Sequence, residues 1–124
     1  MYVEENSRHD PQESYSMSYS IFTIPPFDKQ LKKLSKKYPS IKGDYADFLD
    51  SLEDNPQQGT PLGKGCYKVR MSIASKGKGK SGGARVITHV ILPNDTIYLL
   101  SIFDKGEMET ISDKRLRELL KFIE

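Results

Sequence analysis

The chain has 124 residues, a length that fits one domain with a modest hydrophobic core. Hydrophobic residues make up 36% of it, and no apolar run is long enough to cross a bilayer or to act as a secretory signal near the N-terminus. The single cysteine, Cys66, excludes an internal disulfide and is typical of a reducing compartment, so we expect a cytoplasmic protein.

The chain begins with a polar segment, residues 1–16, that carries acidic residues and has no apolar period. This composition is typical of a disordered tail, so we expect the folded domain to span residues 17–124. Tyr, Ile, Phe and Thr are then enriched over residues 18–24, which predicts a short strand ended by Pro25 and Pro26.

Two amphipathic helices are predicted next. Apolar residues at helical spacing run from Phe27 to Tyr38 and again from Ile41 to Leu52, with Pro39 between the two sets. The polar face of the second helix is acidic, and that of the first is basic, which favours an antiparallel helical hairpin. The basic face could also contact RNA, although a charged helix face is more often only solvated. It consists of Lys29, Lys32, Lys33, Lys36 and Lys37.

A cationic hairpin follows a loop over residues 55–65. Residues 65–74 and 84–92 predict two strands, and the loop between them is rich in glycine and lysine. No acidic residue occurs between Asn55 and Asn94, and a local field of one sign favours a polyanion, most commonly RNA or DNA. Lysine contributes affinity for phosphate backbones rather than base identity. The lysines expected to bind RNA are Lys64, Lys76, Lys78 and Lys80; the alternative is a loop that is only solvated.

Strand alternation places Lys68 and Arg70 on one face of the first hairpin strand, opposite its apolar residues. Arg85 and His89 share a face of the second strand. Like charges at Arg70 and Arg85 would repel unless an anion lay between them, so we expect a phosphate-binding face here. The other interpretation of Arg85 is a salt bridge to an acid elsewhere. A half-buried structural role is favoured for His89 over a catalytic one.

Two nucleotide-binding fingerprints nearly match the hairpin loop. Residues 77–82 spell G-x-G-x-x-G, and residues 74–81 spell a P-loop whose first glycine is replaced. Both motifs need a helix directly after the glycines, whereas residues 85–91 are strand-like, so we expect no nucleotide binding. One cysteine and two separated histidines do not supply the usual ligand sets for a metal, and we expect no cofactor.

The end of the chain completes the predicted fold. Residues 96–103 are nearly all apolar, which predicts a central strand covered on both faces, and Ser112 can cap a last helix. The sequence therefore predicts an α+β domain, a small antiparallel sheet with two N-terminal helices and one C-terminal helix. Lys and Arg on the hairpin can stabilise a pentacovalent phosphate, and RNA cleavage suits them because the 2′-hydroxyl is a built-in nucleophile.

These elements resemble the RelE/ParE toxin superfamily, over about Ser20 to Glu124. The residues that carry the resemblance are Asn55-Pro56-x-x-Gly59-x-x-Leu62, Tyr67-Lys68-Val69-Arg70, Gly83-x-Arg85-Val86 and a hydrophobic strand that ends near Lys105. The loop from Ala74 to Lys80 with Gly82-Gly83, and residues 98–103 followed by Glu107-Met108, are most similar to the HigB-type branch.

The resemblance implies a toxin of a type II toxin–antitoxin pair that cleaves mRNA in the ribosomal A site by 2′-hydroxyl attack and inhibits translation. It implies two partners, a cognate antitoxin protein and the ribosome with bound mRNA, and neither a cofactor nor a membrane. The alternatives are a gyrase-inhibiting toxin of the ParE branch and a basic RNA-binding module without catalysis.

The resemblance also implies site residues. Lys68, Arg70, Arg85 and Lys105 match positions at which the RelE branch has catalytic basic residues. Two other positions depart from the RelE pattern. Gly106 stands where RelE has an arginine, and Ser112 stands about where RelE has a catalytic tyrosine. Lys105 or His89 could fill part of the acid–base role.

Overall fold

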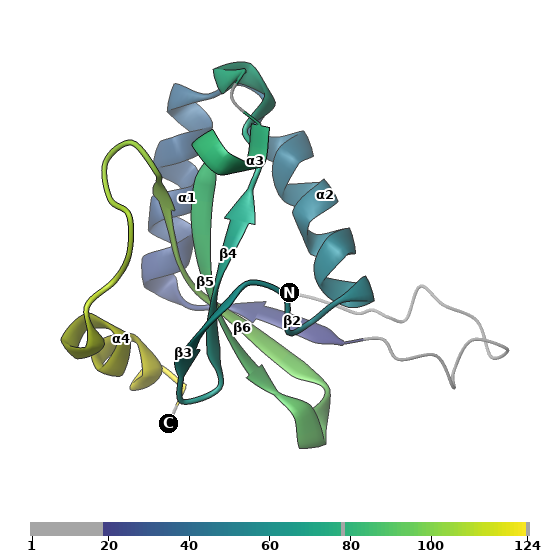
Figure 1. The fold of residues 1–124 in the computed structure, drawn as a ribbon, viewed down its shortest axis with the longest axis vertical. Coiled ribbons are helices and arrows are strands. Elements are labelled where there is room, and N and C mark those ends of the chain that lie inside the picture. Colours follow the sequence, from purple (N-terminus) through teal and green to yellow (C-terminus); the bar gives the residue numbers. More distant parts are fainter. Residues whose placement is uncertain (1–18, 78, 124) are drawn as a thin grey trace, which may run out of the picture.

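The computed structural model describes residues 19–77 and 79–123 (Figure 1). Within them, one sheet of five strands has the order β2-β6-β5-β4-β3. The strands are β2 (Ser20–Thr23), β3 (Thr60–Gly63), β4 (Cys66–Met71), β5 (Ala84–Ile91) and β6 (Thr96–Asp104). The predicted tail, residues 1–16, lies outside the described residues.

The helices are α1 (Pro25–Lys37), α2 (Ile41–Asp54), α4 (Asp113–Leu120) and a short turn, α3 (Gly79–Gly82), with two 3₁₀ turns, η2 (Ala74–Lys76) and η3 (Leu92–Asn94). Figure 1 shows α1 behind the strands, α2 to their right and α4 at the lower left. None of the described helices has the length and apolar character needed to span a bilayer. The predicted α+β class, with two N-terminal helices and one C-terminal helix, is confirmed.

The sheet is mixed. Strands β4, β5 and β6 are antiparallel neighbours, as predicted. Strand β3, antiparallel to β4, falls in the predicted loop 55–65 and was not expected, and β2 pairs in parallel with β6, Ser20 opposite Thr96. The pairing with β2 ends at Leu99, and α1 covers the edge of β6 beyond it. There the Gln30 side-chain oxygen accepts hydrogen bonds from the Ile102 N–H (3.1 Å) and from the Ser101 hydroxyl (3.0 Å). The backbone at this edge therefore keeps a partner where the neighbouring strand stops.

The apolar residues predicted to face the sheet are the ones that form the core. In α1 and α2 the buried positions are Phe27, Leu34, Ile41, Phe48 and Leu52, and in α4 they are Leu116 and Leu119. Almost every residue of β6 is buried, because helices cover both faces of this strand, which confirms the prediction of a central strand. Ser112 caps α4, since its hydroxyl accepts a hydrogen bond from the Arg115 N–H at 3.1 Å.

The two N-terminal helices do not neutralise each other. In the described part of the chain, the ion pairs of α1 run from Lys37 to Asp104 and Glu107 rather than to α2. Each helix packs its own apolar stripe on the sheet, and that packing positions it.

The loop between β4 and β5 is more structured than its composition suggests. The Ala74 N–H donates to the Asp44 carboxylate at 3.1 Å and the Ser75 N–H donates to the Ser40 hydroxyl at 2.9 Å, which fixes η2 against the start of α2. The short turn α3 was not predicted. At the end of the loop a Cβ on Gly83 would lie 2.2 Å from the Met71 carbonyl oxygen, so only glycine fits between the strand ends.

Candidate nucleic-acid interface

The predicted cationic face exists, because the strand register brings its residues together. Arg70 on β4 is directly opposite Arg85 on β5, and Arg85 is opposite Phe103 on β6. Lys68 lies two residues from Arg70 on the same face of β4, away from the buried Val69. The pairing of the two arginines that the sequence predicted is therefore confirmed.

Arg70 is an exposed cation of this face whose charge is available to an anion. Its side chain is exposed, and it forms no hydrogen bond or ion pair with any residue in the described part of the chain. Because the residue opposite is also an arginine, an anion that approaches Arg70 meets no competing carboxylate on these strands. This position can bind a phosphate oxygen with a planar, permanently charged group.

Lys105 and Lys68 are joined by a residue that the sequence did not single out. The Lys105 N–H donates to the Gly83 carbonyl at 3.1 Å, which holds Lys105 beside the start of β5. Its Nζ lies 3.9 Å from the Glu109 carboxylate, and the Lys68 Nζ donates to the Glu109 carbonyl oxygen at 3.3 Å. Glu109 thus brings a carboxylate to the cationic face. In the chain it lies 41 residues from Lys68, so no local pattern could indicate this contact.

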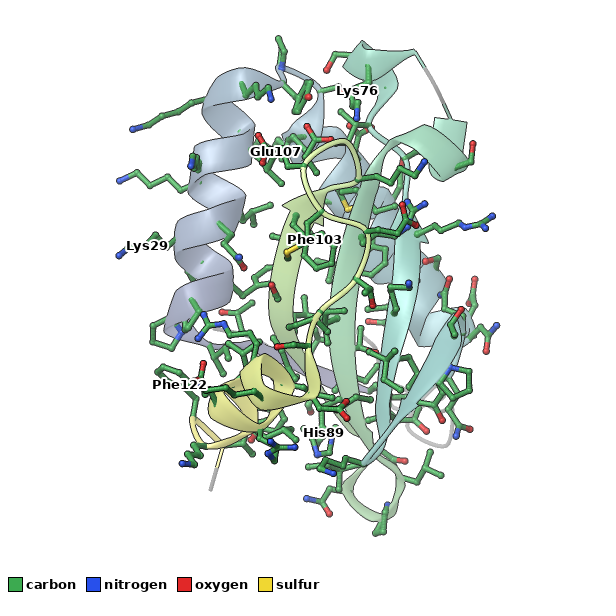
Figure 2. The ribbon with its side chains drawn as sticks, turned by 60° about the vertical axis from the view of Figure 1, so that its left-hand side comes forward. Lys29, Lys76, His89, Phe103, Glu107 and Phe122 are labelled. Atoms are coloured by element: carbon green, nitrogen blue, oxygen red, sulfur yellow. The ribbon has the colours of Figure 1, made fainter. Side chains whose placement is uncertain are left out.

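The segment that carries Glu109 crosses the sheet. Figure 2 shows the yellow strip of chain after β6 passing in front of the strands, from Glu107 down to α4. Both Glu107 and Glu109 are exposed. The candidate site is therefore a shallow face of β4 and β5 bordered by this loop rather than a closed pocket.

Arg85 lies on the predicted face but not in the predicted state. Its side chain is only 4% exposed, and its guanidinium donates to the carbonyl oxygens of Ala84 (3.2 Å) and Ser81 (3.0 Å). The sequence predicted that Arg70 and Arg85 would both be accessible to one anion. This is wrong for Arg85, because its guanidinium already donates hydrogen bonds to the backbone at the end of the loop. Arg85 instead fixes the end of the loop beside Arg70.

Lys76 is likewise not the free loop cation that the sequence predicted. Its Nζ lies 2.7 Å from the Asp104 carboxylate, and its side chain is 13% exposed. Asp104 pairs with Ala84, two residues from the buried Val86 on the face that α1 and α2 cover. The charge of Lys76 is therefore used inside the fold, on the other side of the sheet from Arg70.

Asp104 is the centre of this internal network. Burial by itself would raise its pKa, but hydrogen bonds from Lys76, the Tyr38 hydroxyl (2.5 Å) and the Gly106 N–H (2.9 Å) outweigh burial and hold the pKa well below its ordinary value. Lys37 Nζ adds a cation 3.6 Å away. The network joins η2, the end of α1 and the end of β6.

The remaining predicted residues lie elsewhere or outside the described part. Lys64 is exposed in the turn between β3 and β4, and His89 is opposite Cys66 at that same end of the strands. Along β5, His89 is about 13 Å from Arg85, four residues away. Lys78 and the side chain of Lys80 are not among the described residues, so their assignment stays a prediction. In residues 19–77 and 79–123 no group of three His, Cys, Asp or Glu could hold a metal ion.

His89 has the surroundings of a structural residue. It is half-buried, and its Nδ1 lies 3.5 Å from the Cys66 Sγ. Burial lowers the pKa of His89 from its ordinary 6.5, although hydrogen bonds with the backbone of Gly65 and Lys64 act in the other direction. The ring is therefore neutral at neutral pH. Burial also raises the pKa of the Cys66 thiol to about 11, so no thiolate forms beside it.

This leads to a pH prediction. Below pH 6.5 an unfolded chain protonates His89 more readily than the folded chain does, so acid favours unfolding and the stabilising contribution of the neutral ring is lost as pH falls. We expect the free energy of unfolding to fall between pH 7.5 and 5.5, and to fall less in His89→Gln. Urea titrations of both proteins across this range test it; identical pH dependence would contradict the placement of His89.

Comparison with known proteins agrees with this architecture. No family model matches the chain. A mutant of the E. coli toxin RelE in the free state matches with a TM-score of 0.57 and 16% identity, over 86% of this chain and 99% of that one. The isolated E. coli RelE toxin matches with a TM-score of 0.54 at 16% identity, over 86% and 100%. The chain has a RelE-like fold.

The RelBE2 toxin–antitoxin complex from Mycobacterium tuberculosis is a third match, with a TM-score of 0.52 and 18% identity, over 70% of this chain and 91% of that one. At such identities the similarity establishes the fold. The predicted RelE-like fold is confirmed, and membership of the toxin superfamily and of its HigB-type branch stays a prediction.

Proposed function

We propose that this protein is the toxin of a type II toxin–antitoxin pair and cleaves ribosome-bound mRNA. The observation that carries the proposal is the exposed Arg70 beside Lys68, with Lys105 joined to Lys68 through Glu109, on the cationic face of a RelE-like fold. The cognate antitoxin is the proposed protein partner, since one protein of the same fold is described in a toxin–antitoxin complex. The proposed site of action is the cytoplasm, where the ribosomes are. Within the superfamily, we propose the HigB-type branch.

The chemistry needs a nucleophile, charge stabilisation and two proton transfers. The mRNA supplies the nucleophile, because its 2′-oxygen attacks the adjacent phosphorus while the bond to the 5′-oxygen of the next nucleotide breaks. The products are a 2′,3′-cyclic phosphate and a free 5′-hydroxyl. Arg70 and Lys68 stabilise the charge that collects on the phosphate oxygens in the transition state. No cofactor takes part in this scheme.

The proton transfers are assigned to Glu109 and Lys105, which lie at the border of the cationic face. Glu109 is the general base that accepts the proton of the 2′-hydroxyl, and the ammonium of Lys105, 3.9 Å away, is the acid that protonates the leaving 5′-oxygen. Arg85 acts as a positioning residue through Ser81 and Ala84. His89 has no part in this scheme, because it lies at the far end of the strands.

The test is a purified translation reaction. With wild-type protein we expect cuts in an mRNA that is bound to the ribosome and none in the same mRNA without ribosomes, mapped by primer extension. The readout separates the two alternative functions. Inhibition of gyrase supercoiling without mRNA cleavage would identify a gyrase-inhibiting toxin, and RNA binding without any cleavage would identify a non-catalytic module. Either outcome would overturn the proposal.

A further inference from the structure

A second cationic surface lies on α1, outside the candidate site. Lys29, Lys33 and Lys36 are spaced by four and three residues, so they form one stripe, which we call the α1 lysine row. All three are exposed, and they lie on the side of the helix opposite Phe27 and Leu34, which are buried against the sheet. Figure 2 shows Lys29 projecting away from the sheet on the outer side of α1.

Within residues 19–77 and 79–123, no side chain of the α1 lysine row forms a hydrogen bond or an ion pair with a described residue, whereas Lys37 at the end of the helix pairs with Asp104 and Glu107. Like charges four residues apart, such as Lys29 and Lys33, destabilise a helix slightly. The stability of the helix therefore does not explain why three lysines lie in one row, whereas binding of an external polyanion would.

The composition of the row indicates which polyanion fits. Protein–protein interfaces are depleted in lysine at their centres and depend on buried apolar or aromatic anchors. No exposed large apolar residue lies on α1. Nucleic-acid interfaces are much more positively charged, and lysines contact the phosphates without reading the bases. The row spans about 10 Å along a rigid helix, a length that suits successive phosphates of one strand.

We propose that the α1 lysine row binds the phosphate backbone of a folded nucleic acid, as a contact surface separate from the Lys68–Arg70 face. The two surfaces face different ways, because α1 packs on the face of the sheet where Val69 and Met71 are buried, whereas Lys68 and Arg70 alternate to the other face of β4. A short single strand seated on the cationic face would not contact the row. The partner therefore presents a second segment to the row, as a folded nucleic acid can, and it is RNA if the proposed function holds.

The experiment removes the three charges and measures salt dependence. The variant carries Lys29→Gln, Lys33→Gln and Lys36→Gln in the full chain. Its binding to a fluorescein-labelled 20-base-pair RNA duplex, and to a DNA duplex of the same length, is measured by anisotropy over a series of KCl concentrations. We expect the slope of log K against log [KCl] to become shallower by about 2 to 3, since each phosphate contact contributes about 0.9. A shallower slope with both duplexes supports phosphate binding by the row. A shallower slope with the RNA duplex alone would show that the row binds RNA and not DNA.

A matched control is available on α4. Lys114, Arg117 and Lys121 are exposed cations at helical spacing, and changing all three to Gln removes the same charge. The control should keep the wild-type slope, and replacing the row with three arginines should keep it as well. An equal loss in the α4 control, which would show a net-charge effect, or an unchanged slope in the α1 variant would overturn the proposal.

The outcome is independent of the cleavage reaction. Duplex binding needs no cleavage, so a protein without mRNA cleavage could still show the α1 effect. Arg70→Ala removes at most one phosphate contact, so its slope should become shallower by no more than about 0.9. A loss of duplex binding in Arg70→Ala equal to that in the α1 variant would overturn the separation of the two surfaces.

Discussion

Arg70→Ala should lower the rate of cleavage of ribosome-bound mRNA by about two to three orders of magnitude, the usual effect of removing a positioned electrostatic group. The reason is that the Arg70 guanidinium is exposed and has no partner among the described residues, so its charge is available to the phosphate. The free energy of unfolding should change by less than about 0.5 kcal/mol, as for other surface positions. Single-turnover cleavage with saturating protein, together with a urea titration, measures both.

Two variants serve as comparisons for Arg70→Ala. Arg117→Ala removes an exposed arginine from α4 and should leave the cleavage rate unchanged. Arg85→Ala should destabilise the fold, because it removes the hydrogen bonds that the carbonyl oxygens of Ala84 and Ser81 accept. Wild-type cleavage by Arg70→Ala would mean that the site is misplaced, and global unfolding of that variant would mean that Arg70 is structural.

The parts of the fold that the sequence predicted are those with local signals. Helical spacing from Phe27 to Tyr38 predicted the buried face of α1. The apolar run over residues 96–103 predicted a strand that is covered on both of its faces. Strand alternation was sufficient to place Arg70 and Arg85 on one face, because the loop and the strand lengths set the register. The parallel pairing of β2 joins residues that are 76 positions apart at Ser20 and Thr96, and no local pattern determines it.

The candidate site was predicted less completely, because alternation gives the face of a side chain but not what covers it. Burial of Arg85 depends on the loop folding back over it through Ser81. The loop composition predicts a free cation at Lys76, because its partner Asp104 lies 28 residues away in the chain. Glu109 is 41 residues from Lys68, so its approach to the cationic face follows from the path of the chain after β6.

The Asp104 network gives the second large expected effect. Asp104→Asn should lower the free energy of unfolding at neutral pH by about 3 kcal/mol, as when one partner of a buried ion pair is removed. Lys76, with 13% of its side chain exposed, would lose its carboxylate. The amide nitrogen would also replace one of the two accepting oxygens, so it would face either the Tyr38 hydroxyl or the Gly106 N–H. For a chain of this length the loss corresponds to a fall in Tm of roughly 10 °C or more.

The pH dependence of this loss identifies its cause. Because the folded-state pKa of Asp104 is depressed, its contribution is complete above the unfolded-state pKa of about 3.9 and declines as pH falls through lower values. The difference in stability between wild type and Asp104→Asn should therefore be largest at neutral pH and shrink below pH 4. Asp50→Asn, at an exposed position of α2, is the matched control and should change stability by less than about 0.5 kcal/mol.

A double variant tests whether the unpaired lysine, and not the lost packing of the carboxylate, produces the effect. Adding Lys76→Met to Asp104→Asn removes the uncompensated buried charge, so the double variant should recover part of the lost stability. Urea titrations of the two single variants and the double variant give the coupling energy between Asp104 and Lys76. If Asp104→Asn unfolds at the wild-type urea midpoint, or if Lys76→Met lowers the stability of the double variant further, the ion pair does not hold η2 against β6.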